Sequence, residues 1–199
     1  MEKDIEMLEQ ITALFIQNGA KTVTMDDISK EFGKSKKTLY KQYKSKEDLL
    51  EEVLSYSVDK ILRKMRDLDE KIDNAVERMF ARDEEIEQIS GTNESVMVRQ
   101  LNKYYPQIFI KHMLYFLDSF SEIIVHNIER GREQKLYREN FDAEMYAQLF
   151  AQLVMSYHAS PLVNRKKISK TKYSQEALYF YMNAITTDKG KEVMEKLTL

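Results

Sequence analysis

Helical spacing of apolar residues runs through almost the whole chain, and no other feature constrains the fold as strongly. Apolar residues recur three and four positions apart, which is the period of an amphipathic helix. Only two prolines and five glycines interrupt the 199 residues. The alternation of β-branched residues between tight turns that signals strands is missing. The sequence therefore predicts an all-α fold of about nine helices.

Capping residues and glycines set the limits of the predicted helices. Thr24, Ser35 and Ser45 have hydroxyl groups suited to cap the second, third and fourth helices. Gly19 and Gly33 follow the first and second helices, where a glycine commonly ends a helix. The predicted helices cover residues 4–18, 25–33, 36–43, a fourth from residue 46, then 69–89, 94–104, 107–132, 142–159, 173–187 and a short tail after residue 188.

Composition excludes several classes of protein. The absence of cysteine rules out disulfides, thiol catalysis and cysteine-ligated zinc. Residues 1–10 carry charges from the second position and lack the apolar core of a signal peptide. The longest uncharged run, 145–164, includes Gln148, Gln152 and Pro161 and is too polar to span a bilayer. We therefore expect a cytoplasmic protein without a membrane partner.

Charge is distributed unevenly along the chain. The net charge is only −2, which by itself argues against a nucleic-acid binder. Residues 21–46, however, hold eight lysines and three acids, whereas residues 67–94 hold ten acids and three basic residues. A basic N-terminal module is thus joined to an acidic body. The local field, rather than the total charge, determines whether phosphate is attracted.

Residues 22–46 have the layout of a helix-turn-helix. Two short predicted helices meet at a tight glycine turn, and the second is basic, capped by serine and rich in hydroxyl groups. In a helix-turn-helix the second helix enters the major groove of DNA. Ile28 and Leu39 are spaced to form the small core that fixes the two helices, and Phe15 and Phe32 are expected to complete it.

A series of positions at fixed spacing, without gaps, runs through the first fifty or so residues: Leu14-Phe15, Asn18-Gly19, Thr24-Met25-Asp26-Asp27-Ile28, Gly33, Ser35-Lys36, Thr38-Leu39-Tyr40, Tyr43 and Ser45-Lys46-Glu47-Asp48-Leu49-Leu50. In these positions the segment resembles the TetR family of bacterial transcriptional regulators. The family usually has a small residue at Phe32, an apolar one at Lys34 and often glycine at Lys37, so Lys34 and Lys37 add charge beside the DNA.

The resemblance implies roles for individual side chains. The hydroxyls of Thr24 and Tyr40 would donate to phosphates, and Lys46 would neutralise a phosphate with help from its helix dipole. Lysine suits guanine, glutamine suits adenine and the threonine methyl suits that of thymine. A lone lysine is most simply a solvated charge; the cluster on this scaffold favours DNA binding. The predicted DNA-binding residues are Thr24, Ser35, Lys36, Lys37, Thr38, Tyr40, Gln42 and Lys46.

Two helices near the C-terminus are apolar on more than one side. These are the predicted helices 142–159 and 173–187. Helices of this kind need partners on most sides, which a homodimer provides by forming a four-helix bundle. The TetR resemblance implies the same interface, since the family dimerises through its last two long helices. Two copies would also read two half-sites of DNA.

The resemblance further implies a small-molecule cavity between the fourth and seventh helices. Methionine and aromatic side chains suit an adaptable apolar pocket, and they suit an ordinary core equally well. We expect an apolar or aromatic effector. The candidate lining residues are Met79, Phe80, Met97, Tyr104, Tyr105, Phe109, Met113, Phe116 and Phe120.

Together these patterns predict a helix-turn-helix domain over 1–50 and an effector-binding and dimerisation domain over 51–199. The expected function is a DNA-binding repressor released by a ligand; the alternative is a ligand-independent activator or architectural dimer. An enzyme is not expected, because no phosphate loop or nucleophile elbow occurs. His112 and His126 are about 21 Å apart on one predicted helix. We therefore expect neither a cofactor nor a metal.

Overall fold

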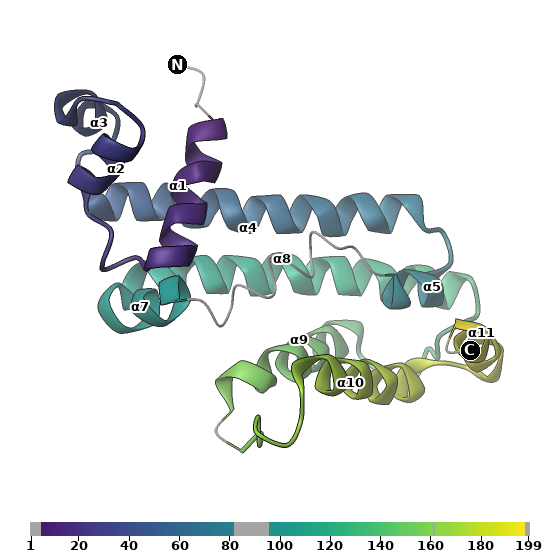
Figure 1. The fold of residues 1–199 in the computed structure, drawn as a ribbon. Helices are drawn as coiled ribbons and strands as arrows, with labels where there is room; N and C mark the ends of the chain where they lie inside the picture. The colour runs from purple at the N-terminus through teal and green to yellow at the C-terminus, as the bar shows by residue number, and fades with distance from the viewer. Residues whose placement is uncertain (1–4, 82–95, 161, 198–199) are drawn as a thin grey trace. The chain divides into compact units, whose positions relative to one another are not determined.

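The structure is a computed structural model that describes residues 5–81, 96–160 and 162–197, without the side chains of residues 158 and 159. Within these residues the chain is all-α, as predicted, and the only strand-like pairing is a bridge between Tyr137 and Thr186. None of the described helices is both long and apolar enough to cross a membrane. The helices are α1 (Ile5–Asn18), α2 (Met25–Glu31), α3 (Lys36–Gln42), α4 (Lys46–Lys71), α5 (Ala75–Phe80), α7 (Val96–Tyr104), α8 (Pro106–Glu133), α9 (Ala143–Ala159), α10 (Lys170–Ile185) and α11 (Asp188–Leu197) (Figure 1).

The predicted continuous helix over 69–89 is wrong within the described residues. α4 continues to Lys71, and the chain then turns before the short helix α5. The reason is Asn74, whose side-chain oxygen accepts hydrogen bonds from the backbone of Val76 and Glu77 at 3.0 and 3.1 Å. This cap starts a new helix instead of continuing the old one. The part of the predicted helix from residue 82 onward lies outside the described residues.

Contacts divide the chain into two compact units. The first contains residues 1–62 and 84–116, and the second contains residues 63–83 and 117–199. α4 and α8 each contribute residues to both units. The predicted domains, 1–50 and 51–199, divide the chain by function rather than by packing and stay a prediction.

The core of the first unit holds the helix-turn-helix together. Ile28 and Leu39 are buried as predicted, Phe15 is fully buried, and Phe32 packs against this core from a half-buried position. The core also includes two residues from another part of the chain, because α7 packs beside α1 and buries Met97 and Leu101 there. The small helix-turn-helix is therefore stabilised by a helix some sixty residues away in sequence.

The loop between α1 and α2 is fixed to α7 by one side chain. The Gln100 amide oxygen accepts hydrogen bonds from the backbone of Lys21 and Thr22, and its nitrogen donates to the Thr22 hydroxyl at 3.1 Å. Gly19 begins this loop with φ +94°, and its backbone N–H donates to Phe15 at 2.8 Å. A side chain at this glycine would therefore disturb both the α1 terminus and the contact with α7.

Replacing Gly19 by alanine is expected to lower the free energy of unfolding by about 2–3 kcal/mol. The new Cβ would have an unfavourable φ and would lie 2.5 Å from the Gln100 amide oxygen. Gly33→Ala is the matched control, because its φ is also positive, at +60°, but no atom of the described residues lies within 4 Å of the new Cβ. Urea unfolding of both variants measures the difference. Equal losses would show that the contact with α7 contributes nothing.

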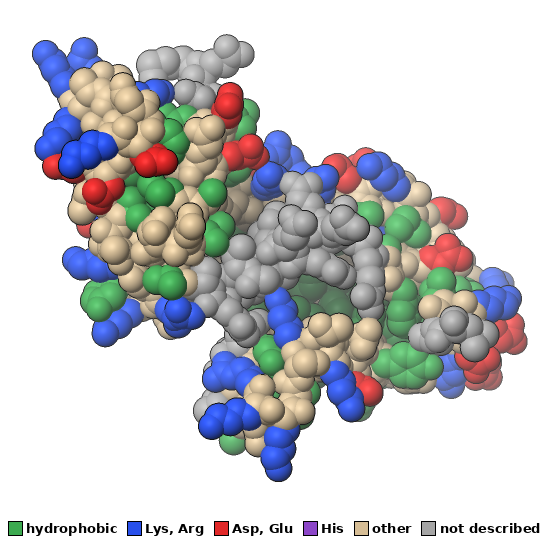
Figure 2. Space-filling view, in the orientation of Figure 1, with side chains coloured by type: hydrophobic (Ala, Val, Ile, Leu, Met, Phe, Trp, Pro, Cys, Tyr) green, Lys and Arg blue, Asp and Glu red, His purple; other side chains and the backbone are tan. Residues whose placement is uncertain are grey.

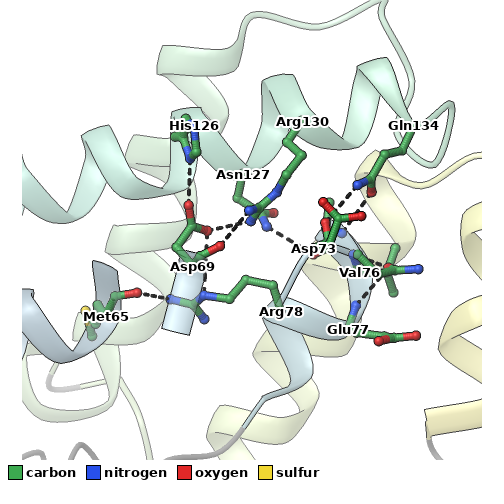
Figure 3. Close-up of polar contacts among 12 residues, drawn as sticks. Met65, Asp69, Asp73, Val76, Glu77, Arg78, His126, Asn127, Arg130 and Gln134 are labelled. Atoms are coloured by element: carbon green, nitrogen blue, oxygen red, sulfur yellow. Dashed lines mark hydrogen bonds and ion pairs between the residues drawn. The ribbon is translucent and has the colours of Figure 1, made fainter. Parts of the chain in front are cut away.

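A buried ion network joins three helices of the second unit (Figure 3). Asp69 of α4 is 6% exposed. It accepts hydrogen bonds from Arg130 and His126 of α8, both at 2.6 Å, and Arg78 of α5 lies 3.6 Å away. Arg78 also donates to the Met65 carbonyl at 2.9 Å. One carboxylate thus compensates two buried guanidinium groups, whose desolvation is costly without a counter-charge.

Hydrogen bonds beside this network fix the beginning of α5. Asn127 and Tyr137 both donate to the carbonyl of Ala75, at 3.1 and 2.9 Å. The amide oxygen of Gln134 accepts from the Ala75 backbone N–H at 3.0 Å, and its nitrogen donates to the Asp73 carbonyl at 2.7 Å. These contacts satisfy backbone groups that the break after α4 would otherwise leave unpaired.

Candidate nucleic-acid interface

Thr24, which was predicted to contact a DNA phosphate, caps the start of α2 through reciprocal hydrogen bonds with Asp27. The Thr24 hydroxyl accepts from the Asp27 backbone at 3.2 Å and donates to the Asp27 carboxylate at 2.6 Å. The hydrogen bonds from Thr24 lower the pKa of Asp27. The proton that Thr24 was expected to offer to a phosphate is therefore already donated within the protein. A phosphate contact would have to replace Asp27 as its acceptor.

α3 presents one polar, basic side to solvent. The Ser35 hydroxyl caps this helix, accepting from the Thr38 backbone at 3.1 Å and pairing with the Thr38 hydroxyl at 2.8 Å. Lys37 and Tyr40 are exposed, Tyr40 to 49%, and the side chain of Leu39 is buried on the opposite side. Figure 2 shows Lys and Arg side chains gathered around α3. The helix is thus oriented by its apolar side.

Two of the predicted base-reading residues have partners within the protein. The Lys36 ammonium is 2.5 Å from Asp26 of α2, and both side chains are exposed. The Gln42 amide nitrogen donates to the hydroxyl of the buried Tyr43 at 3.0 Å. Sequence reasoning missed both contacts. Breaking the exposed ion pair of Lys36 requires little free energy. Moving the half-buried Gln42 would require more, because the hydroxyl of the buried Tyr43 would lose this hydrogen bond.

Lys46 lies at the first position of α4, beside the loop that precedes α2. Its ammonium donates to the backbone carbonyl of Lys21 at 3.1 Å and can still donate two hydrogen bonds. Burial lowers the pKa of Lys46, and the charge of Lys21 lowers it further. Ser45 caps the same helix by accepting from the Asp48 backbone at 3.1 Å. The helix dipole and the ammonium therefore favour an anion at the same point.

The predicted DNA-binding residues all belong to the first unit. Figure 1 shows α2 and α3 beside the N-terminal end of α4. Two short helices, an exposed basic side on the second, and a lysine at the start of a third form the arrangement of a DNA-binding helix-turn-helix.

Comparison with known families agrees with this arrangement. Residues 7–53 match the model of the bacterial regulatory proteins of the TetR family. Residues 7–53 form a TetR-family domain. Members of this family are DNA-binding regulators rather than enzymes, and this chain has their N-terminal domain. The residues that were expected to contact DNA lie inside the matched segment.

Solved structures extend the likeness beyond the matched segment. A TetR-family regulator from Agrobacterium tumefaciens is 17% identical with a TM-score of 0.68, covering 92% of this chain and 97% of that one. Reduced NemR from E. coli is 16% identical with a TM-score of 0.69 and the same coverage. A regulator from Cytophaga hutchinsonii is 16% identical with a TM-score of 0.73, covering 94% and 100%. A search of curated proteins found no match. At these identities the structures show a shared fold.

The predicted pocket residues are distributed over two compact units. In the first, Met97 is buried in the core, Tyr105 and Phe109 pack against it, and Tyr104 is 46% exposed. Met113 and Phe116 are half-buried on the part of α8 in the same unit. In the second unit Met79 and Phe80 are half-buried on α5, and Phe120 stacks on Phe150 with ring centroids 6.0 Å apart. Their role in lining a pocket stays a prediction.

The described histidines have carboxylate partners in separate places. His112 of the first unit is 2.8 Å from Glu51, and His126 of the second is 2.6 Å from Asp69. Hydrogen bonds from Lys111 and His112 lower the pKa of Glu51, with that from Lys111 the larger cause. Within the described residues, no three His, Asp or Glu side chains come together as metal ligands.

Proposed function

We propose that this TetR-family protein is a transcriptional repressor that binds operator DNA as a homodimer in the cytoplasm and is released by a small apolar or aromatic ligand. The observation that carries the DNA contact is the exposed basic side of α3. Leu39 and Tyr43 are buried behind this helix, which leaves Lys37 and Tyr40 toward solvent. A seven-residue helix presented in this way fits the major groove.

The roles of the contacting residues follow from their chemistry. Lys37 and Thr38 would contact base edges directly. Lys36 would do so after its ion pair with Asp26 breaks, and Gln42 after its hydrogen bond to Tyr43 breaks. Tyr40 and Lys46 would contact phosphates, and Thr24 would do so by exchanging Asp27 for a phosphate oxygen. Phosphate contacts set register and affinity, whereas base contacts set sequence preference.

Exposed apolar side chains on α9 and α10 support a homodimer. Phe180 of α10 is 70% exposed, and Leu149 of α9 is 48% exposed. The opposite sides of both helices are covered in the monomer, because Phe150 and Tyr181 are buried with ring centroids 4.5 Å apart. Large apolar side chains exposed on the outer side of a packed helix pair are typical of a subunit interface. A second copy of the chain would bury Leu149 and Phe180 together.

Ligand release would act through α4. This helix carries Lys46 at its first residue and Asp69 near its last, so it contributes to both compact units. A neighbouring solved structure from Saccharomonospora viridis, with a TM-score of 0.72, contains choline. We infer that a ligand bound in the body would shift α4 and change the spacing of the two α3 helices. A spacing that no longer matches one turn of DNA lowers operator affinity.

Titration of the protein against the DNA upstream of its own gene, beside random DNA and at two salt concentrations, tests the proposal. We expect tight, salt-dependent binding that prefers the upstream DNA.

Tyr40→Phe should weaken binding to both DNAs equally, because only a phosphate contact is lost. Gln42→Ala should relax preference at one base pair by about 1–3 kcal/mol.

Sequence selection from a random library gives the comparison for Gln42→Ala. An unchanged preference would remove Gln42 from the base-reading residues and leave its hydrogen bond to Tyr43 as its role. Wild-type protein that binds upstream and random DNA equally would contradict operator recognition. A screen for compounds that dissociate the complex then tests release, and operator affinity that no bound ligand changes would contradict the repressor mechanism.

A further inference from the structure

Two lysines outside the helix-turn-helix contacts gather around one exposed aromatic ring. The Lys21 ammonium lies 5.8 Å from the centroid of the Tyr104 ring, and the Lys103 ammonium lies 5.0 Å from the same centroid. Lys21 belongs to the loop between α1 and α2, and Lys103 and Tyr104 end α7. We name these three residues the Tyr104 patch. Each ammonium is within the range of a cation–π contact.

The Tyr104 patch carries two positive charges that no ion pair among the described residues compensates. In the part of the chain that the structure describes, no carboxylate forms an ion pair with Lys21 or Lys103. Like charges that converge on one ring repel each other, and a cation–π contact at an exposed site is weak. An exposed cluster of this kind is stabilised when an anion approaches both ammonium groups.

The patch is held in place by the protein. The Gln100 amide accepts from the Lys21 backbone and makes two further hydrogen bonds with Thr22, so the loop that carries Lys21 is fixed on the helix that carries Lys103. The side chains therefore start from positions already close to each other. This lowers the ordering entropy that a bound anion would otherwise cost.

The patch is also continuous with the predicted phosphate site at the start of α4. The Lys46 ammonium donates to the Lys21 carbonyl at 3.1 Å. The Lys21 charge lowers the pKa of Lys46 more than either nearby acid, Glu47 or Asp27, raises it. Asp27 is itself engaged by Thr24. Figure 2 shows Lys and Arg side chains over α7 as well as around α3.

We propose that Lys21, Lys103 and Tyr104 form a second contact with the phosphate backbone of operator DNA, outside the helix-turn-helix. The inference rests on the proposed function, since it extends the same DNA-binding surface. DNA fits better than a single small anion, because the patch is open to solvent and adjoins a predicted phosphate site. Its contacts are sequence-independent: the lysines neutralise phosphates, and Tyr104, 46% exposed, holds their side chains together and offers its hydroxyl.

The test is the salt dependence of DNA binding by a Lys21→Gln/Lys103→Gln double variant. Each phosphate contact contributes about 0.9 to the slope of log K against log salt. We expect the slope to become less steep by about two. Affinity should fall by the same factor on operator and random DNA, and the selected sequence should stay unchanged.

The control is Lys166→Gln/Lys167→Gln, which makes the same charge change at two exposed lysines of the second unit. Its slope should match that of the wild type. Equal slopes for all three proteins, or a loss confined to operator DNA, would overturn the proposal while leaving the helix-turn-helix contact intact. Absence of operator preference in the wild type would instead contradict the proposed function. Far-ultraviolet circular dichroism and urea midpoints establish that both variants fold.

Discussion

Replacing Asp69 by alanine is expected to lower the free energy of unfolding by about 3–5 kcal/mol. Among the residues that the structure describes, the substitution removes the only carboxylate paired with Arg78 and Arg130, whose side chains are only 12% and 15% exposed. Each guanidinium would then lack this counter-charge, and within the described part of the chain one buried nitrogen of each already has no hydrogen-bond partner. Removing one partner of a buried ion network lowers the free energy of unfolding by far more than the intact network adds to it.

Urea unfolding at neutral pH measures this loss, and two variants separate its causes. Asp73→Ala removes an exposed carboxylate nearby, while the backbone carbonyl that Gln134 uses is kept; it should change stability by less than about 0.5 kcal/mol. Adding Arg78→Met to Asp69→Ala should recover part of the loss, because one uncompensated charge is removed. A loss below about 1 kcal/mol for Asp69→Ala alone would show that water reaches both guanidinium groups.

The helix-turn-helix could be predicted from the sequence because the contacts that define it are local. Thr24 bonds Asp27, Ser35 bonds Thr38 and Ser45 bonds Asp48, each across three residues. Spacing of this kind is visible in a single sequence, and so is the apolar pair Ile28 and Leu39.

Contacts between distant segments account for the features that the sequence did not reveal. Ala75 starts α5 partly because Gln134 accepts its N–H, 59 residues away. Asp69 finds its partners 57 and 61 residues further along the chain, and no local pattern marks them. Nearly half of Tyr104 is exposed, which its residue type could not predict, because an aromatic residue is equally compatible with a core, a pocket or a surface.

The sequence also did not reveal which groups of the protein the polar ends of the DNA-binding side chains contact. The sequence placed Gln42 and Lys36 on the recognition helix, but their present partners, Tyr43 and Asp26, depend on how that helix packs. Residue type and helical position therefore predict which side chains are available near DNA. Packing determines which of these side chains must first break a contact within the protein. The free energy of breaking that contact reduces the free energy that the side chain gains by contacting DNA.

Leu149→Glu combined with Phe180→Glu is expected to convert the protein to a monomer and to weaken operator binding by about 10²–10³-fold. Both side chains are exposed in the single chain, so glutamate there leaves the monomer fold intact. In a two-fold interface each substitution buries an uncompensated charge against the partner subunit, and it does so twice, which is strongly unfavourable. A monomer reads one half-site, so it keeps roughly half of the specific free energy of binding.

Sedimentation measures the state of association, and titration of full and half operators measures the loss. The matched control is Ile110→Glu/Leu114→Glu, which adds the same charges at two exposed apolar positions of α8 in the first unit. The α9–α10 variant should bind full and half operators equally, while the control should keep its preference for the full operator. If the control becomes monomeric and the α9–α10 variant stays dimeric, the subunit interface lies on α8, and the exposed side of α9 and α10 serves another partner.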